Sequence, residues 1–339
     1  MAEDTVEPTD TAAQAGIIWI LVDQSSREAT YQTVADLLRE RPGVEVHIVT
    51  INEVLSSVAR EALTGGAERL LRGLRVAMRG RNQDEDFLGA VRRGRPDLLA
   101  ITNPRWTRAL GLLESLTGIA SLQIGVFPDY DFDESWTKSA LHGFVVPHST
   151  FRDRLAREGV APERILVGGP AIHVAFAREL DRAAERERFG FADEQVVLVR
   201  AETFEASLLE KIVFQATLVE RDVRFVFHHN GDGTVASTLR RAASQYGLKA
   251  GMFGRVDDLE RYILTADAVL ASPRDPFIPE ILALDRPLLL LGPPHGANAQ
   301  IEFLREVGAA RALADVLRLG SELERFLEPE ALAKIEEAA

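Results

Sequence analysis

Short runs of aliphatic and β-branched residues recur along the chain, and each is followed by a longer segment with the spacing of an amphipathic helix. The first run covers residues 17–22 (IIWILV). Ser25 and Glu28 follow it with the three-residue spacing of a capping box, which predicts a helix to about Arg39. Parallel strands need crossover connections of this length. The pattern therefore predicts an α/β protein.

The strand pattern occurs in two series. The first contains six expected strands, at residues 17–22, 44–51, 97–102, 122–127, 144–147 and 165–167. The second contains five, at residues 195–200, 224–228, 250–253, 268–270 and 287–291. The runs are apolar almost throughout, which is typical of strands covered on both faces. Two Rossmann-like domains facing each other across a cleft are the expected architecture.

Changes in composition predict the domain boundaries. Residues 1–15 are acidic and rich in Thr, Ala and Pro, and we expect a disordered tail there. We assign residues 16–172 to the first domain and residues 194–320 to the second. The charged segment 173–193 is predicted to be a connecting helix and hinge. A last helix is expected over residues 321–339.

Charge and cysteine content restrict the possible partners and surroundings. The 339-residue chain has a formal net charge of −13, which would repel a nucleic-acid backbone over most of the surface. The absence of cysteine excludes disulfides and thiolate catalysis, and it is compatible with a cytoplasmic location. No apolar run approaches the ~20 residues of a transmembrane helix. We therefore expect a cytoplasmic protein, with peripheral binding to the inner membrane face as an alternative.

A set of motifs between residues 97 and 310 provides a family resemblance. The first half carries PDYDFDESW, FVVPHST and REGVAPERILVGGPAI, and the second carries GRVDDLERYILTADAVLASP, PEILALDRPLLL and FLREVGAA. Their order and spacing resemble the processive diacylglycerol and monogalactosyldiacylglycerol glycosyltransferases, a family that includes the peptidoglycan N-acetylglucosamine transferase. The resemblance implies the glycosyltransferase B architecture. It also implies a nucleotide-sugar donor, uridine-linked, on the second domain, and a lipid or other hydroxyl acceptor on the first, with no metal and no further cofactor.

Three glycine-rich turns of that family are altered in this chain. Residues 23–26 (DQSS) replace a turn that carries a general-base histidine, residues 200–202 (RAE) replace a glycine run, and residues 273–277 (PRDPF) replace a Pro-Gly-Gly-x-Thr turn. Glycine suits such turns because it has no Cβ and lets backbone N–H groups approach phosphates. Two hypotheses remain open: a transferase with a re-wired site, or a degenerate fold that binds a nucleotide, a glycan or a protein without turnover.

Four candidate donor-site residues lie in the second series. Glu280 matches the family carboxylate that holds the ribose hydroxyls. Arg200 and Arg274 stand where phosphate-facing glycines are expected, and each guanidinium could either bind phosphate or fill the pocket. A re-wired site requires both to face the cleft without acidic partners, whereas a filled site predicts that Arg274 pairs with Asp275 or Glu280. His228 follows a strand, where it is either an anion contact or part of a turn.

Two further residues are candidates for catalysis. Asp129 matches the family aspartate at the cleft edge, with a turn or helix-capping role as the alternative. His148 ends an expected strand, where a neutral imidazole could accept a proton from an acceptor hydroxyl. Its alternative is a surface histidine that precedes a helix cap at Ser149. The acidic residues 129–134 lack the glycine and glutamate of a calcium loop, so we expect no metal site.

A basic segment offers a possible membrane contact. Five arginines alternate with apolar residues, at positions 69, 72, 75, 79 and 81. Such a face could lie on an anionic membrane surface, which would fit a lipid acceptor, or it could be a solvated helix face.

Overall fold

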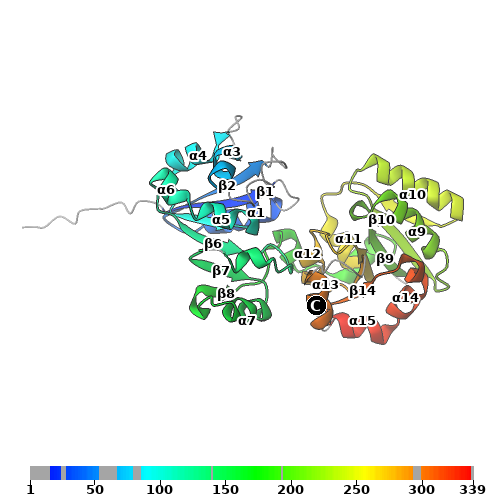
Figure 1. The fold of residues 1–339 in the computed structure, drawn as a ribbon. Coiled ribbons are helices and arrows are strands. Elements are labelled where there is room, and N and C mark those ends of the chain that lie inside the picture. Colours follow the sequence, from blue (N-terminus) through cyan, green and yellow to red (C-terminus); the bar gives the residue numbers. More distant parts are fainter. Residues whose placement is uncertain are drawn as a thin grey trace, which may run out of the picture. The chain divides into compact units, whose positions relative to one another are not determined.

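The computed structural model describes residues 16–23, 28–52, 67–78, 85–138, 140–191, 194–292 and 299–336. The predicted tail at residues 1–15, Ser25 of the expected capping box, and Arg79 and Arg81 of the basic segment lie outside these ranges. The chain forms two compact units, which Figure 1 shows in sequence colours. Unit 1 spans Met1–Val126 and Glu134–Gly168, and unit 2 spans Phe127–Asp133 and Gly169–Ala339.

Unit 1 is built on one eight-stranded sheet. Its strands are β1 (Gly16–Asp23), β2 (Val44–Asn52), β3 (Arg75–Met78), β4 (Glu85–Asp86), β5 (Leu98–Ile101), β6 (Leu122–Val126), β7 (Gly143–Val146) and β8 (Ile165–Val167). They lie in the order β4-β3-β2-β1-β5-β6-β7-β8. The six strands that the sequence predicted are mutually parallel, while β3 and β4 add an antiparallel edge.

Helices connect the strands of unit 1. They are α1 (Glu28–Arg39), α3 (Ala67–Gly73), α4 (Phe87–Gly94), α5 (Thr107–Leu110), α6 (Leu113–Thr117) and α7 (Ser149–Arg157), with short 3-10 turns η1 (Pro104–Trp106), η2 (Glu134–Trp136) and η3 (Pro162–Arg164). The basic segment is therefore not one helix face, because α3 ends at Gly73 and Arg75 begins β3. Arg72 pairs with Glu68 on α3 instead of standing in an uncompensated basic row.

Unit 2 is built on a six-stranded, fully parallel sheet. Its strands are β9 (Gln195–Arg200), β10 (Val223–His228), β11 (Ala250–Phe253), β12 (Ala268–Ala271), β13 (Leu288–Leu291) and β14 (Ala310–Leu313), in the order β11-β10-β9-β12-β13-β14. The sequence predicted the first five. Strand β14 was missed because its pattern, ARAL, places a charged residue between apolar ones.

Unit 2 contains eight helices among its described residues. They are α8 (Arg182–Arg188), α9 (Ala206–Ala216), α10 (Gly233–Tyr246), α11 (Leu259–Thr265), α12 (Ile278–Ala283), α13 (Ala299–Glu306), α14 (Leu319–Phe326) and α15 (Pro329–Glu336), with 3-10 turns η4 (Val174–Ala177), η5 (Ala201–Thr203) and η6 (Val316–Arg318). The single last helix of the sequence prediction is thus a pair, α14 and α15. No described helix of the chain is long and apolar enough to cross a membrane.

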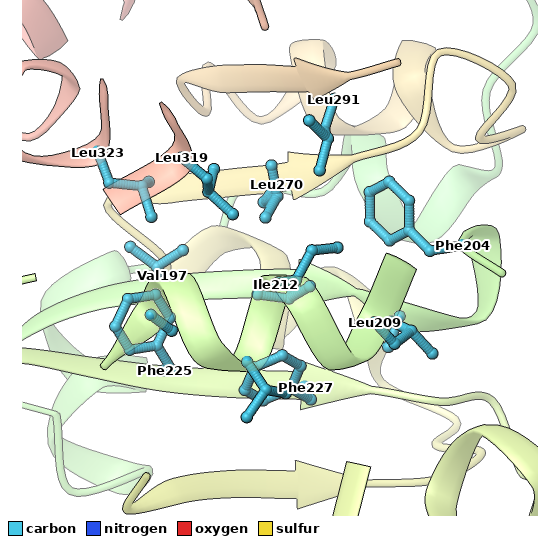
Figure 2. Close-up of a cluster of buried hydrophobic side chains, with 14 of the residues drawn as sticks. Val197, Phe204, Leu209, Ile212, Phe225, Phe227, Leu270, Leu291, Leu319 and Leu323 are labelled. Carbon is cyan, nitrogen blue, oxygen red and sulfur yellow. The ribbon is translucent and has the colours of Figure 1, made fainter. Parts of the chain in front are cut away.

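The core of unit 2 lies on both faces of its sheet. Val197 and Val199 of β9 point into one cluster, with residues of α9, α10 and α14. Figure 2 shows Val197 in that cluster, beside Ile212 and Phe225. Val196 and Leu198 point into the opposite cluster, with residues of α11, α12 and α13. Complete burial of a Val or Leu side chain contributes roughly 1.5–3 kcal/mol, so this two-sided packing fixes β9 firmly.

The segment predicted to be a hinge packs on unit 2. Asp267, just before β12, accepts hydrogen bonds from Arg182 of α8 at 2.6 Å, from Arg186 of α8 at 3.1 Å and from the backbone N–H of Val196 at 2.8 Å. The last change from unit 1 to unit 2 along the chain lies between Gly168 and Gly169, where Gly169 has a φ of 76°, and the predicted domain bounds stay a prediction.

Candidate functional site

The strand order of unit 2 predicts where a ligand would bind. The chain adds β10 and β11 on one side of β9 and then β12, β13 and β14 on the other side. The order of strands therefore switches between β9 and β12, although all six strands run parallel. In open parallel sheets, ligands bind outside the carboxyl ends of the strands at such a switch point. Arg200 is the last residue of β9, and Asp275 follows β12. These two residues therefore lie at the expected ligand position and define the candidate site.

Arg200 is buried at the switch point within a network of ion pairs. Only 1% of the residue is exposed. Its Nε lies 2.8 Å from Oδ2 of Asp275, and its Nη2 lies 3.3 Å from Oδ1 of the same carboxylate. Its Nη2 also lies 3.0 Å from Oε1 of Glu202, in the turn that follows β9. The planar fork of the guanidinium thus binds Asp275 through two nitrogens, which is the strong form of this interaction.

His228 completes the buried network from the neighbouring strand. It ends β10 and stands opposite Arg200 in the parallel register. Its Nδ1 lies 2.8 Å from Nη1 of Arg200 and 2.9 Å from Oε1 of Glu202. The imidazole packs on the ring of Phe253, with 4.8 Å between ring centres. His228 is therefore part of the buried cluster, and the predicted turn follows it at Asn230 and Gly231, where both φ angles are positive.

Acidic side chains surround the guanidinium of Arg200. Burial lowers the pKa of the Arg200 guanidinium, but the negative charges of Asp275 and Glu202 raise it more, and its pKa lies above the ordinary value. Glu280, in α12, adds to the same effect. The guanidinium also lies 4.6 Å from the ring centre of Phe277. One permanent cation therefore faces three carboxylates, an arrangement that disfavours a further anion.

The loop after β12 is fixed by hydrogen bonds. The backbone N–H of Ser272 donates to Oγ1 of Thr203 at 3.2 Å, and that hydroxyl donates to the carbonyl of Arg200 at 2.7 Å. The carbonyl of Pro273 accepts from Nε2 of Gln300 at 2.8 Å. The loop is thus tied both to the turn after β9 and to α13.

Arg274 and Glu280 occupy opposite environments. The side chain of Arg274 is exposed, and among the described residues no carboxylate pairs with it. Glu280 is only 1% exposed and lies close enough to Arg200 to raise its pKa. The pairing of Arg274 with Asp275 or Glu280, which a filled site predicted, is not seen among the described residues, and Asp275 pairs with Arg200 instead. Arg200 likewise does not meet the requirement for a re-wired site, since it is buried and paired.

The comparisons with known proteins give matches only among solved structures. Neither a scan against protein-family models nor a search of curated proteins found a significant match. MnaA from S. aureus, solved with UDP, superposes with a TM-score of 0.65 and 14% identity, covering 96% of this chain and 91% of its own. The UDP-GlcNAc 2-epimerase from Neisseria meningitidis bound to UDP-GlcNAc superposes with a TM-score of 0.64 and 12% identity, covering 94% of each chain. HepE from Anabaena, solved with UDP and glucose, superposes with a TM-score of 0.55 and 12% identity, covering 95% of this chain and 93% of its own.

This chain has the glycosyltransferase B fold. The predicted fold class, α/β with two Rossmann-like domains, is confirmed. At these identities the likeness shows the fold alone, so the ligand and the reaction have to be argued from the site.

Asp129 stabilises a turn in this glycosyltransferase B fold. Its Oδ1 accepts a hydrogen bond from the backbone N–H of Asp131 at 2.9 Å. The next residue, Tyr130, donates its backbone N–H to Gln300 at 3.0 Å and stacks on Phe303. Burial and the charges of the neighbouring aspartates raise the pKa of Asp131 above its ordinary value. The observed contact of Asp129 is the turn alternative, and a role at a ligand stays a prediction.

His148 caps α7 in unit 1. Its Nδ1 accepts from the backbone N–H of Thr150 at 3.2 Å, which makes His148 itself the N-cap and not Ser149 as expected. With Nδ1 accepting this bond, the neutral ring carries its proton on Nε2, so neither ring nitrogen can take a proton from an acceptor hydroxyl while the cap is formed. No group of side chains among the described residues has the composition of a metal site.

The sequence missed Glu202 and Asp275 as members of the buried cluster. Glu202 was noted only as part of an altered glycine turn, and Asp275 only as a partner for its neighbour. The available signal was an arginine at the end of an apolar strand, since such a charge needs a buried partner. The partner is 75 positions away in the sequence, so the adjacency of β9 and β12 was needed to find it.

Proposed function

We propose that this chain binds a uridine diphosphate sugar on unit 2, at the carboxyl ends of β9 and β12. The observation that carries the proposal is the match, over more than nine-tenths of both chains, to three structures solved with UDP, UDP and glucose, or UDP-GlcNAc. The polar side chains of unit 2 that gather at its switch point support the location. Ligands of this fold class bind at that edge.

Within this proposal, the candidate residues have distinct roles. Glu280 would hold the ribose hydroxyls, as the family resemblance implies. Arg274 would contact the phosphates, because its guanidinium is exposed and has no carboxylate partner among the described residues. The activity that fits is transfer of the sugar to a lipid or other hydroxyl acceptor, with His148 as a candidate general base once its Nδ1 leaves the cap of α7.

A second candidate function is binding without turnover. It is favoured by the burial of Arg200, which fills a turn where the related transferases have glycine and which already has two carboxylate partners. A diphosphate leaving group needs positive charge to stabilise it, and the arginine of this cluster is already paired with two carboxylates. A degenerate glycosyltransferase B fold would then act as a nucleotide-, glycan- or protein-binding module.

A thermal-shift screen of the full chain tests the ligand class. UDP, UDP-glucose and UDP-GlcNAc are compared with GDP and ADP at equal concentration. A ligand at 100 times its Kd should add roughly 2.7 kcal/mol of stability, which is a readily measured shift. We expect the uridine compounds to stabilise the protein more than GDP or ADP. Equal or absent stabilisation by all five would overturn the uridine assignment.

An activity assay then separates the two candidate functions. Release of UDP from each sugar nucleotide is measured with and without a diacylglycerol acceptor in vesicles. Acceptor-dependent release that falls at least ~100-fold in His148→Ala would support transfer, since removing a general base typically costs 10²- to 10⁴-fold. Binding without release of UDP would support the second candidate.

A further inference from the structure

The carboxylate of Asp275 is bound as an external anion would be. Its Oδ1 accepts a hydrogen bond from the backbone N–H of Phe277 at 2.8 Å and lies 3.3 Å from Nη2 of Arg200. Its Oδ2 accepts from Nε of Arg200 at 2.8 Å. The side chain is completely buried. The carboxylate thus uses a guanidinium fork and a backbone N–H together, at the switch point of the sheet.

The same donors are those that a phosphate group uses. Guanidinium forks bind phosphate and carboxylate oxygens with similar two-point geometry, and backbone N–H groups complete many phosphate sites. The altered sequence supplies both sides of the contact. Arg200 and Asp275 each stand in a segment where the family resemblance implies a glycine-rich turn. Glycine has no side chain, so such a turn would leave the space between the two segments open to a ligand.

We propose that Asp275 occupies the position of a ligand phosphate, and that it thereby determines how strongly the site binds a diphosphate. This inference rests on the proposed function, because it concerns the same site. An ionised Asp275 and a phosphate cannot both occupy the guanidinium fork of Arg200. Glu202 and Glu280 add to the repulsion. The wild-type site should therefore gain less affinity from the two phosphates of UDP than it would if the guanidinium fork of Arg200 were free.

The test variant is Asp275→Asn. Asparagine keeps the shape of the side chain and an oxygen that can accept from the backbone N–H of Phe277, but it removes the negative charge. Arg200 keeps Glu202 as an ion-pair partner. A phosphate then has to displace only a neutral amide from the fork. Asp275→Ser, which also keeps an acceptor oxygen, is the second variant in case the first does not fold.

Asp267→Asn is a matched control in the same unit. Asp267 is also held by two guanidinium nitrogens and one backbone N–H, from Arg182, Arg186 and Val196. It lies before β12, at the amino end of the strand, whereas Asp275 lies beyond the carboxyl end. The control therefore removes a similar carboxylate from the opposite edge of the sheet.

The measurement is isothermal titration of the full chain with uridine and with UDP. The quantity compared is the ratio of the uridine Kd to the UDP Kd. We expect Asp275→Asn to raise this ratio by at least ~10-fold, which corresponds to about 1.4 kcal/mol, and Asp267→Asn to leave it unchanged. A ratio that is unchanged or lower in Asp275→Asn, or that rises equally in the control, would overturn the inference.

The outcomes also separate this inference from the proposed function. UDP binding by Asp275→Asn but not by the wild type would support the inference while overturning the proposed function of the native chain. If the wild type binds UDP and the ratio is unchanged in Asp275→Asn, the proposed function is supported and the inference about Asp275 is overturned. If no protein binds either compound, both are wrong.

Discussion

Replacement of Arg200 by Met should destabilise unit 2 strongly. Methionine fills much of the same volume but removes the only permanent positive charge of the buried cluster. Asp275, whose side chain is fully buried, and Glu202, whose side chain is 15% exposed, would then lose their shared cation. His228 would lose its contact with the guanidinium as well.

The magnitude follows from the burial of these groups. Removing one partner of a buried ion pair costs about 3–5 kcal/mol, because the remaining charge is left without compensation. Arg200 is 1% exposed and has two carboxylate partners, so we expect a loss in this range for the unfolding free energy of unit 2.

Urea denaturation can assign the loss to one unit. All three tryptophans, Trp19, Trp106 and Trp136, belong to unit 1, so tryptophan fluorescence reports unit 1, whereas far-UV circular dichroism reports both units. In Arg200→Met, the urea midpoint of a transition seen by circular dichroism should fall, while the midpoint of the tryptophan fluorescence transition should stay the same.

A surface ion pair provides the control for this experiment. Arg241 pairs with Glu210 at 3.2 Å, and its side chain is 60% exposed. Arg241→Met should cost at most about 1 kcal/mol, as is usual for exposed pairs. If Arg200→Met costs no more than Arg241→Met, the buried cluster does not stabilise unit 2 and the reasoning is refuted.

Three further predictions concern single side chains. Glu280→Ala should weaken UDP binding by about 1–3 kcal/mol in titration calorimetry, and equal affinity would remove Glu280 from the ribose site. Arg274→Gly should weaken UDP more than uridine by about 10-fold, since hydrogen bonds to charged groups contribute about 1.5–3 kcal/mol; unchanged or tighter UDP binding would mean that it does not contact phosphate. Asp131→Asn should stabilise the protein at pH 7 by a few tenths of a kcal/mol, because the raised pKa of Asp131 marks an unfavourable charge. That gain should disappear below about pH 4, where Asp131 is protonated in both the folded and the unfolded state. Urea titrations at pH 7 and below pH 4 measure it, and a loss of stability in the variant at pH 7 would contradict the prediction.

The sequence predicted the sheets well where packing is two-sided. Residues 195–200 form an apolar run because helices cover both faces of β9, and such runs are visible without a structure. Strand β3 was missed because its neighbours alternate in a way that also suits a helix, and only the pairing with β2 decides between them. Edge strands generally have weaker patterns, since one side lacks a partner strand.

The candidate site was harder to predict for a physical reason. The sequence pointed to segments at strand ends, because strand ends and altered glycine turns can be recognised locally. It could not determine that Arg200 turns inward to Asp275, since that contact depends on the register of β9 with β12. Nor could it foresee that His148 would cap its own helix.

Hydrogen exchange with and without UDP, followed by mass spectrometry of peptides, tests the central claim most directly. If UDP binds at the switch point of unit 2, peptides covering residues 200–204 and 272–281 should exchange more slowly in its presence, because these segments follow β9 and β12. Peptides from β8 in unit 1 serve as the internal reference and should not change. Unchanged exchange in both unit 2 segments at a saturating UDP concentration, or protection confined to unit 1, would contradict the account.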